Sequence, residues 1–273
     1  MTPLRYVYAV CRPLCAPLQA QLTGVAGAPA RQLEHHGLVA VVSLVPAGEF
    51  GEEGLGARSR DPERSAVMSR AHQNIVDALT GVTTPLPLPP GMVFPDDSAV
   101  RVMIEEHEED FRRALERLEG RVEWGVRVCL EAARASETES GRTREKAEEF
   151  ACRLHEALSG QAEDSRLHTS RKMVPSGMPG RGVLDAVYLV PRSRSEEFVE
   201  RVERVDRAEV GIQGVRVELT GPWAVYSFTG LEGITETTGS AVNAKNEESA
   251  EIAKTAEGAA RSGARPHERR TAV

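Results

Sequence analysis

The sequence feature that most constrains the fold is an abrupt change in the spacing of apolar residues at Gly120. Over residues 96–120, apolar side chains from Val100 to Leu118 recur at intervals of three and four, which predicts one amphipathic helix. Asp and Ser residues at its start and the glycine at its end suit helix caps. In residues 121–130, apolar side chains instead alternate with Arg and Glu, as in a strand with one buried face. A helix followed directly by such a strand predicts a mixed fold of helices and sheet.

The preceding residues predict a similar mixture. Residues 4–11 and 37–45 are rich in β-branched residues and have the length of strands, whereas residues 46–60 have the composition of a loop. Asp61 and Pro62 are suited to begin a helix that ends near Gly81. The prolines of residues 83–94 remove backbone donors, so we expect an irregular strand there. This order of elements suits an antiparallel sheet covered by helices on one face.

The second half of the chain repeats this alternation. Helices are predicted along the stripe from Ala147 to Leu158 and from Ser193 through Val205. Strand-like segments are residues 164–174, 183–190, 214–221 and 224–228.

The composition of two segments predicts the domain boundaries. Residues 132–145 are small and polar, as in a linker, and residues 229–273 have too little apolar surface to offset the entropy of ordering. We therefore predict an N-terminal domain over residues 1–131, a linker over 132–145, a C-terminal α+β domain with an antiparallel sheet over 146–228, and a disordered tail over 229–273.

Charge and cysteine content bear on partners and compartment. The 273 residues carry a formal net charge of −7, which argues against nucleic acid as a partner. The longest apolar runs are shorter than a membrane-spanning helix requires, so no membrane partner is expected. The four cysteines are widely spaced and no secretory signal precedes them, which predicts a cytoplasmic protein.

No stretch of sequence predicts a catalytic site. The acidic residues around His107 lack the second histidine of a zinc-binding helix, and His35 and His36 have no nearby carboxylate or cysteine cluster. Cys11 and Cys15 are spaced unlike a redox pair and are interpreted as buried thiols. The glycine-rich residues 176–182 lead into a strand rather than a helix, unlike a phosphate-binding loop. We expect no enzyme activity, no cofactor and no metal site.

Several stretches, taken in order, resemble the gas vesicle accessory proteins of the L/F type. They are "YVYAV" (6–10), "GLVAVVS" (37–43), "AHQNIVDAL" (71–79), "PLPLPPGMVF" (85–94), "EEHEEDFRRALERLEGRVEWGVRV" (105–128), "LHEAL" (154–158), "DAVYLVPR" (185–192) and "TGPWAVYSF" (220–228). The sequence departs from the family at two adjacent positions, because Pro89 and Pro90 stand where an Arg-Phe pair is usual.

The resemblance implies a fold and a role. The fold would be two α+β domains, the N-terminal one a modified ferredoxin fold. The role would be assembly of the gas vesicle, through binding of the small hydrophobic shell protein or other accessory proteins to nucleate or guide the shell in the cytoplasm. Two alternatives stay open: a minor structural component of the shell, and a small-ligand sensor or enzyme. Whether the chain self-associates is not indicated by the sequence.

The stretch "TGPWAVYSF" gathers aromatic residues in a chain that has only 4% of them. Because strand side chains alternate between faces, its aromatic side chains cannot all share one face. We expect Trp223 to anchor a turn and Val225, with Tyr226 or Phe228, to close the second domain. The candidate partner contacts are Trp223, Tyr226 and Phe228, of which one should lie near the surface.

Overall fold

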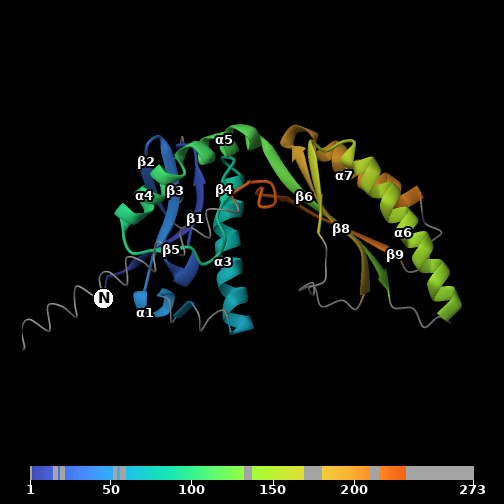
Figure 1. Cartoon of the computed structure of the whole chain (residues 1–273), viewed down its shortest axis with the longest axis horizontal. Coiled ribbons are helices and arrows are strands. Elements are labelled where there is room, and N and C mark those ends of the chain that lie inside the picture. The colour runs from blue at the N-terminus through green and yellow to red at the C-terminus, as the bar shows by residue number, and fades with distance from the viewer. Residues whose placement is uncertain are drawn as a thin grey trace, which may run out of the picture. The chain divides into compact units, whose positions relative to one another are not determined.

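The structure is a computed structural model that describes residues 2–14, 18, 22–51, 54–55, 60–131, 137–168, 180–208 and 215–231 (Figure 1). Residues Met1–Gly230 form one compact unit. Within the described ranges, no helix has the length and apolar character needed to cross a membrane. The predicted tail lies outside the described residues from position 232 onward.

The first sheet is antiparallel and has the order β2-β3-β1-β4, with β5 also paired to β1. Its strands are β1 (Leu4–Cys11), β2 (Arg31–His35), β3 (Leu38–Val45), β4 (Leu86–Pro87) and β5 (Val93–Phe94). The two-residue strands β4 and β5 confirm the irregular strand expected from the prolines of residues 83–94. Strand β2 was not predicted, because Leu33 is its single apolar residue.

Helices cover both faces of this sheet. β1 and β3 are buried at nearly every position, which requires apolar cover on two sides. Figure 1 shows α3 (Pro62–Thr80) and α4 (Asp97–Glu106) on opposite sides of these strands. The expectation of helices on one face was therefore wrong.

Three further helices belong to this described part. They are η1 (Val25–Gly27), α1 (Ala47–Phe50) and α5 (Glu108–Leu118). α1 lies where a loop was expected, and its Phe50 is almost fully buried. Asp61 caps α3 as predicted by accepting bonds from the backbone of Glu63 and Arg64. The single helix predicted over residues 96–120 is two helices, α4 and α5, with a break at His107.

The second sheet is antiparallel with the order β7-β8-β6-β9. Its strands are β6 (Arg121–Glu131), β7 (Asp164–Leu167), β8 (Gly180–Pro191) and β9 (Val215–Trp223). Helices α6 (Glu137–Ser159) and α7 (Ser195–Ala208) pack on one face of it, and the short η2 (Arg192–Arg194) precedes α7. Alternate residues of β6, from Val122 to Val128, enter the core beneath these helices, as their period of two predicts.

Strand pairing assigns β6 to the second sheet. This strand, placed by prediction in the N-terminal domain 1–131, pairs with β8 and β9 and belongs to the second sheet. Helix α6 begins at Glu137, inside the predicted linker 132–145, and residues 132–136 lie outside the described residues. The strand type was evident from local alternation, whereas its partners lie more than fifty residues further along the chain.

The chain after β9 turns back to the first core. The strand expected over residues 224–228 is irregular, and Ala224 and Tyr226 pack against the core that β1, β3 and α3 form. This segment therefore contacts the first core through Ala224 and Tyr226 and the second sheet through Phe228, whose ring lies beside Arg166 of β7. It ties the two sheets of the compact unit together.

Candidate functional site

The end of β9 is shaped by Gly221. This residue has φ = +126°, a conformation that L side chains rarely adopt. A Cβ placed there would lie 2.9 Å from the carbonyl oxygen of Glu123 and 3.0 Å from the Trp124 ring. Glycine therefore allows β9 to lie against β6 just before the chain leaves the sheet.

Glu123 of β6 anchors the segment that follows. Its side chain is largely buried, and Oε2 accepts hydrogen bonds from the backbone N–H groups of Tyr226 (3.0 Å) and Ser227 (2.7 Å). The Ser227 hydroxyl donates to Oε1 at 2.8 Å. Burial raises the pKa of Glu123, and the bonds from Ser227 and Tyr226 oppose that shift. A second tether joins the Arg117 guanidinium to the Phe228 carbonyl.

The three aromatic residues of this segment differ in exposure. Phe228 is fully buried with the Arg166 guanidinium 5.2 Å from its ring centroid, and Tyr226 is half-buried. Trp223 is 38% exposed and is therefore the aromatic residue of this segment that lies nearest the surface. Of the three candidate partner contacts, Trp223 offers the most surface.

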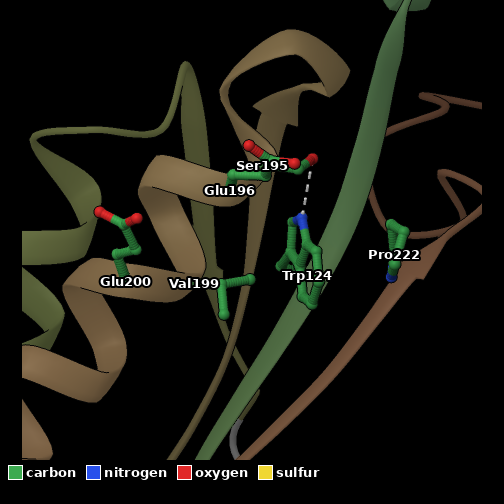
Figure 2. Close-up of a pocket in the computed structure, with 6 residues that line it drawn as sticks. All are labelled: Trp124, Ser195, Glu196, Val199, Glu200 and Pro222. Carbon is green, nitrogen blue, oxygen red and sulfur yellow. Dashed lines mark hydrogen bonds between the residues drawn. The ribbon is translucent and has the colours of Figure 1, made fainter.

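A pocket of about 430 Å³ lies between β6, β9 and the start of α7, with Pro222 of β9 in its lining (Figure 2). The Trp124 ring forms its floor, held by an indole N–H that donates to the Ser195 hydroxyl at 3.3 Å. The other lining residues are Glu196, Val199, Glu200 and Pro222. An apolar floor with two carboxylates on α7 suits an apolar group that adjoins a positive charge.

The outer edge of β9 continues this surface. Among the described residues β9 pairs with β6 alone, so its other edge is open. Val215, Val217 and Leu219 pack only partly against the second core and leave part of their surface accessible. On the opposite face of the sheet, Arg127 contacts Asp185 and Glu218 at 3.6 Å. β9 thus presents an apolar row on one face and ion pairs on the other.

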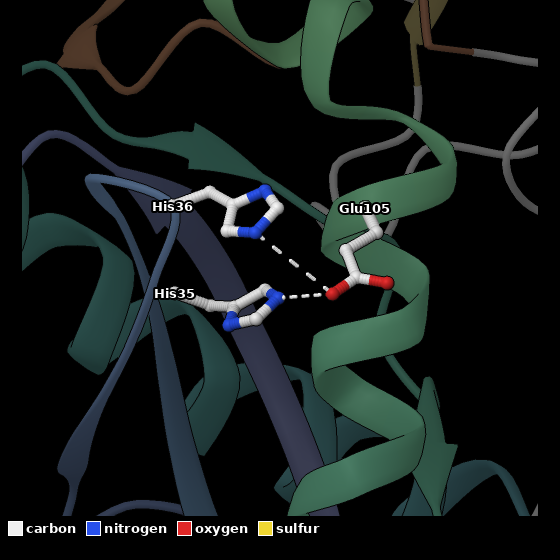
Figure 3. A group of neighbouring side chains, drawn as sticks. All are labelled: His35, His36 and Glu105. Atoms are coloured by element: carbon white, nitrogen blue, oxygen red, sulfur yellow. Dashed lines mark hydrogen bonds and ion pairs between the residues drawn. The ribbon is translucent and has the colours of Figure 1, made fainter.

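A separate group of polar side chains lies where the turn between β2 and β3 meets the α4–α5 junction (Figure 3). His35 Nε2 lies 2.6 Å from a Glu105 carboxylate oxygen, and His36 Nδ1 lies 2.6 Å from Glu108. The bonds from His36 and Arg112 lower the pKa of Glu108. Sequence reasoning found no carboxylate near these histidines because Glu105 is 70 residues from His35.

The other histidines and cysteines considered as catalytic or metal-binding candidates do not lie together. His107 occupies the helix break, and the His155 ring lies 2.8 Å from the Tyr188 hydroxyl. Cys11 is buried as expected, and burial raises the pKa of its thiol to about 12. Cys15 and most of the glycine-rich residues 176–182 lie outside the described residues.

Comparison with known protein sequences identifies gas vesicle proteins as relatives. The sequence model described as gas vesicle synthesis protein GvpL/GvpF matches residues 4–142 and 129–230. Gas vesicle protein L of Streptomyces sp. (strain CB03234) is 44% identical, over 84% of this chain and 93% of its own length. Gas vesicle protein F of the same strain is 25% identical, over 82% of this chain and 98% of its own.

Solved structures show the same fold. The crystal structure of gas vesicle protein GvpF from Anabaena sp. PCC7120 matches with a TM-score of 0.61 at 16% identity, covering 84% of this chain and 96% of that one. Gas vesicle protein GvpF from Microcystis aeruginosa matches with a TM-score of 0.58 at 17% identity, covering 85% and 100%.

Proposed function

Since the chain belongs to the GvpL/GvpF family of gas vesicle synthesis proteins, we propose that it is a non-catalytic accessory factor that binds gas vesicle subunits during assembly in the cytoplasm. Its partners are the small hydrophobic shell protein and other accessory proteins, and its task is to nucleate or guide the growing shell. The higher identity to a protein L than to a protein F, 44% against 25%, supports an L-type role.

The observation that carries this proposal is the edge of β9 that is open among the described residues, together with the exposed Trp223 and the pocket that Pro222 lines. An open edge offers backbone donors and acceptors to an added strand, and neighbouring pockets can select its side chains. The proposed occupant is an extended apolar segment of the shell subunit with a basic residue next to it. Its apolar side chains would cover Val217 and Leu219, and the basic residue would approach Glu196 and Glu200.

The physical need for such a factor follows from the shell protein itself. A subunit apolar enough to enclose gas would aggregate before assembly if its apolar surface stayed exposed. Covering that surface contributes roughly 25 cal/mol per Å² of apolar area buried. A shell subunit that binds reversibly along the edge of β9 could then be transferred to the growing shell.

We further propose that the compact unit contains two domains, a modified ferredoxin-like domain and a second α+β domain. The separate sheets and cores support this division, with a boundary near Gly120 rather than at residue 131. Segment 224–228 would then set the spacing between the domains.

The substitution Trp223→Ala tests the partner surface. The variant should lose binding to purified shell protein in a pull-down while its melting temperature stays close to that of the wild type, because the side chain is partly exposed. Leu167→Ala is the matched control, since Leu167 is 58% exposed on β7 at the opposite edge of the same sheet. Equal binding by wild type and Trp223→Ala would contradict the proposed surface, and enrichment of neither shell nor accessory proteins by the wild type would contradict the proposed function.

A further inference from the structure

The turn between β2 and β3 presents two histidine side chains side by side. His36 has φ = +49° and Gly37 has φ = +72°, so the chain reverses within two left-handed residues, as in a tight hairpin turn. The two imidazole rings are stacked, with centroids 4.2 Å apart and planes 15° from parallel. Both rings therefore direct nitrogen atoms toward the same neighbouring element (Figure 3).

That element is the junction of α4 and α5, which supplies carboxylates. Glu105, in the last turn of α4, places one oxygen 2.6 Å from His35 Nε2 and 3.9 Å from His36 Nε2. The three ligand atoms lie within 4.8 Å of one another. They come from two separate parts of the chain that meet only in the folded protein.

We propose that His35, His36 and Glu105 form a binding site for a divalent transition-metal ion of the Zn²⁺ class. Two imidazoles and one carboxylate are a ligand set that zinc takes in proteins, with a fourth position left for water or another ligand. Tetrahedral zinc with bonds of about 2.0–2.1 Å sets its ligand atoms about 3.3 Å apart. The observed separations of 2.6 and 3.9 Å lie on either side of that value, and because the nitrogen lone pairs lie in the ring planes, the two stacked rings would tilt relative to each other to reach one ion.

The surroundings of His36 match this role. With Nε2 directed at the site, its Nδ1 faces Glu108 Oε2 at 2.6 Å. A carboxylate bonded to the far nitrogen of a ligating histidine fixes the tautomer and the ring orientation. Glu108 is held in turn by the Arg112 guanidinium at 2.9 Å, and Arg112 also donates to the His36 carbonyl.

The site is accessible from solvent. The His36 and Glu105 side chains are about half exposed, at 50% and 49%, whereas His35 is 19% exposed. An ion can therefore enter without opening the fold, and the fourth position faces outward. A bound ion would link the hairpin turn to the helix junction, and because it binds the folded form only, it would raise the melting temperature. This inference does not depend on the proposed partner surface.

The test is calorimetric titration of the tag-free, metal-free full chain with Zn²⁺ and, separately, with Mg²⁺. Wild type should bind one Zn²⁺ at this site and show no comparable affinity for Mg²⁺, which prefers a shell of oxygen ligands. His35→Ala, His36→Asn and Glu105→Gln should each abolish or strongly weaken that binding; Asn is chosen at position 36 because it tolerates positive φ. Glu108→Gln should weaken it by about 10- to 100-fold.

The matched control is His168→Ala, which removes an exposed histidine at the end of β7 and should leave binding unchanged. Circular dichroism of each variant establishes that it is folded. Substitution by Co²⁺ adds a second readout, since its visible spectrum reports nitrogen and oxygen ligation and should change in Glu105→Gln. Absence of saturable Zn²⁺ binding by the wild type would overturn the proposal, and so would binding by His35→Ala or Glu105→Gln that is as tight as that of the wild type.

Discussion

At the scale of single residues, the first core contains a buried polar group that makes folding sensitive to acid. His72 of α3 is 1% exposed, and its Nδ1 lies 3.0 Å from the Tyr6 hydroxyl. The Tyr6 oxygen accepts a bond from the Gly91 backbone, so its proton is directed to the histidine. A hydrogen bond with the Leu88 backbone favours the charged ring, but burial outweighs it. The ring is therefore held neutral, and burial lowers its pKa to about 4.

This depressed pKa predicts a pH-dependent stability. Between about pH 6.5 and pH 4 the unfolded chain binds a proton at His72 and the folded chain does not, so the free energy of unfolding falls as the pH is lowered through that window. The expected loss from this residue is about 3 kcal/mol, and it levels off below pH 4. Urea denaturation at a series of pH values measures it.

The control for this prediction is His72→Gln, which keeps a hydrogen-bond acceptor but has no titrating ring. Its absolute stability is expected to be lower, whereas its pH dependence over the same window should be shallower than that of the wild type. Parallel curves for the two proteins would show that His72 is not the source.

At the scale of elements, what the sequence predicted correctly was local. The helix cap at Asp61 and the alternating burial along β6 each depend on residues that are neighbours in the sequence. Both predictions are confirmed. The break at His107 was missed because the apolar stripe continues through it in register. The sheet to which β6 belongs and the meeting of His35 with Glu105 both depend on partners far along the chain, which periodicity does not specify.

The segment after β9 provides a prediction at this scale. Glu123→Ala should destabilise the protein by about 2–4 kcal/mol, because the backbone N–H groups of Tyr226 and Ser227 would lose their shared acceptor. Glu123→Gln keeps one carbonyl acceptor and should cost less. Chemical denaturation of both variants at neutral pH checks this, and limited proteolysis should cut near residue 226 faster in the alanine variant. If Glu123→Ala and Glu123→Gln both lowered the free energy of unfolding by the same small amount, Glu123 would not anchor this segment.

At the scale of the whole molecule, the fold presents a surface for a partner while securing the parts around it. Both sheets belong to one compact unit, and segment 224–228 joins the first core to β6 of the second sheet. The second sheet keeps its helices on one face and its β9 edge open among the described residues. If the proposed function holds, a subunit bound along β9 would contact a sheet that segment 224–228 links to the first core.

Hydrogen exchange of the backbone amides in β9 tests this account most directly. Purified protein is compared with and without shell protein, and exchange is followed residue by residue across 215–223. The account predicts that added shell protein slows exchange of the outward-facing amides of β9, with β7 at the opposite edge unchanged. The result that would contradict this prediction is binding of shell protein with no change in the exchange rate of the β9 amides.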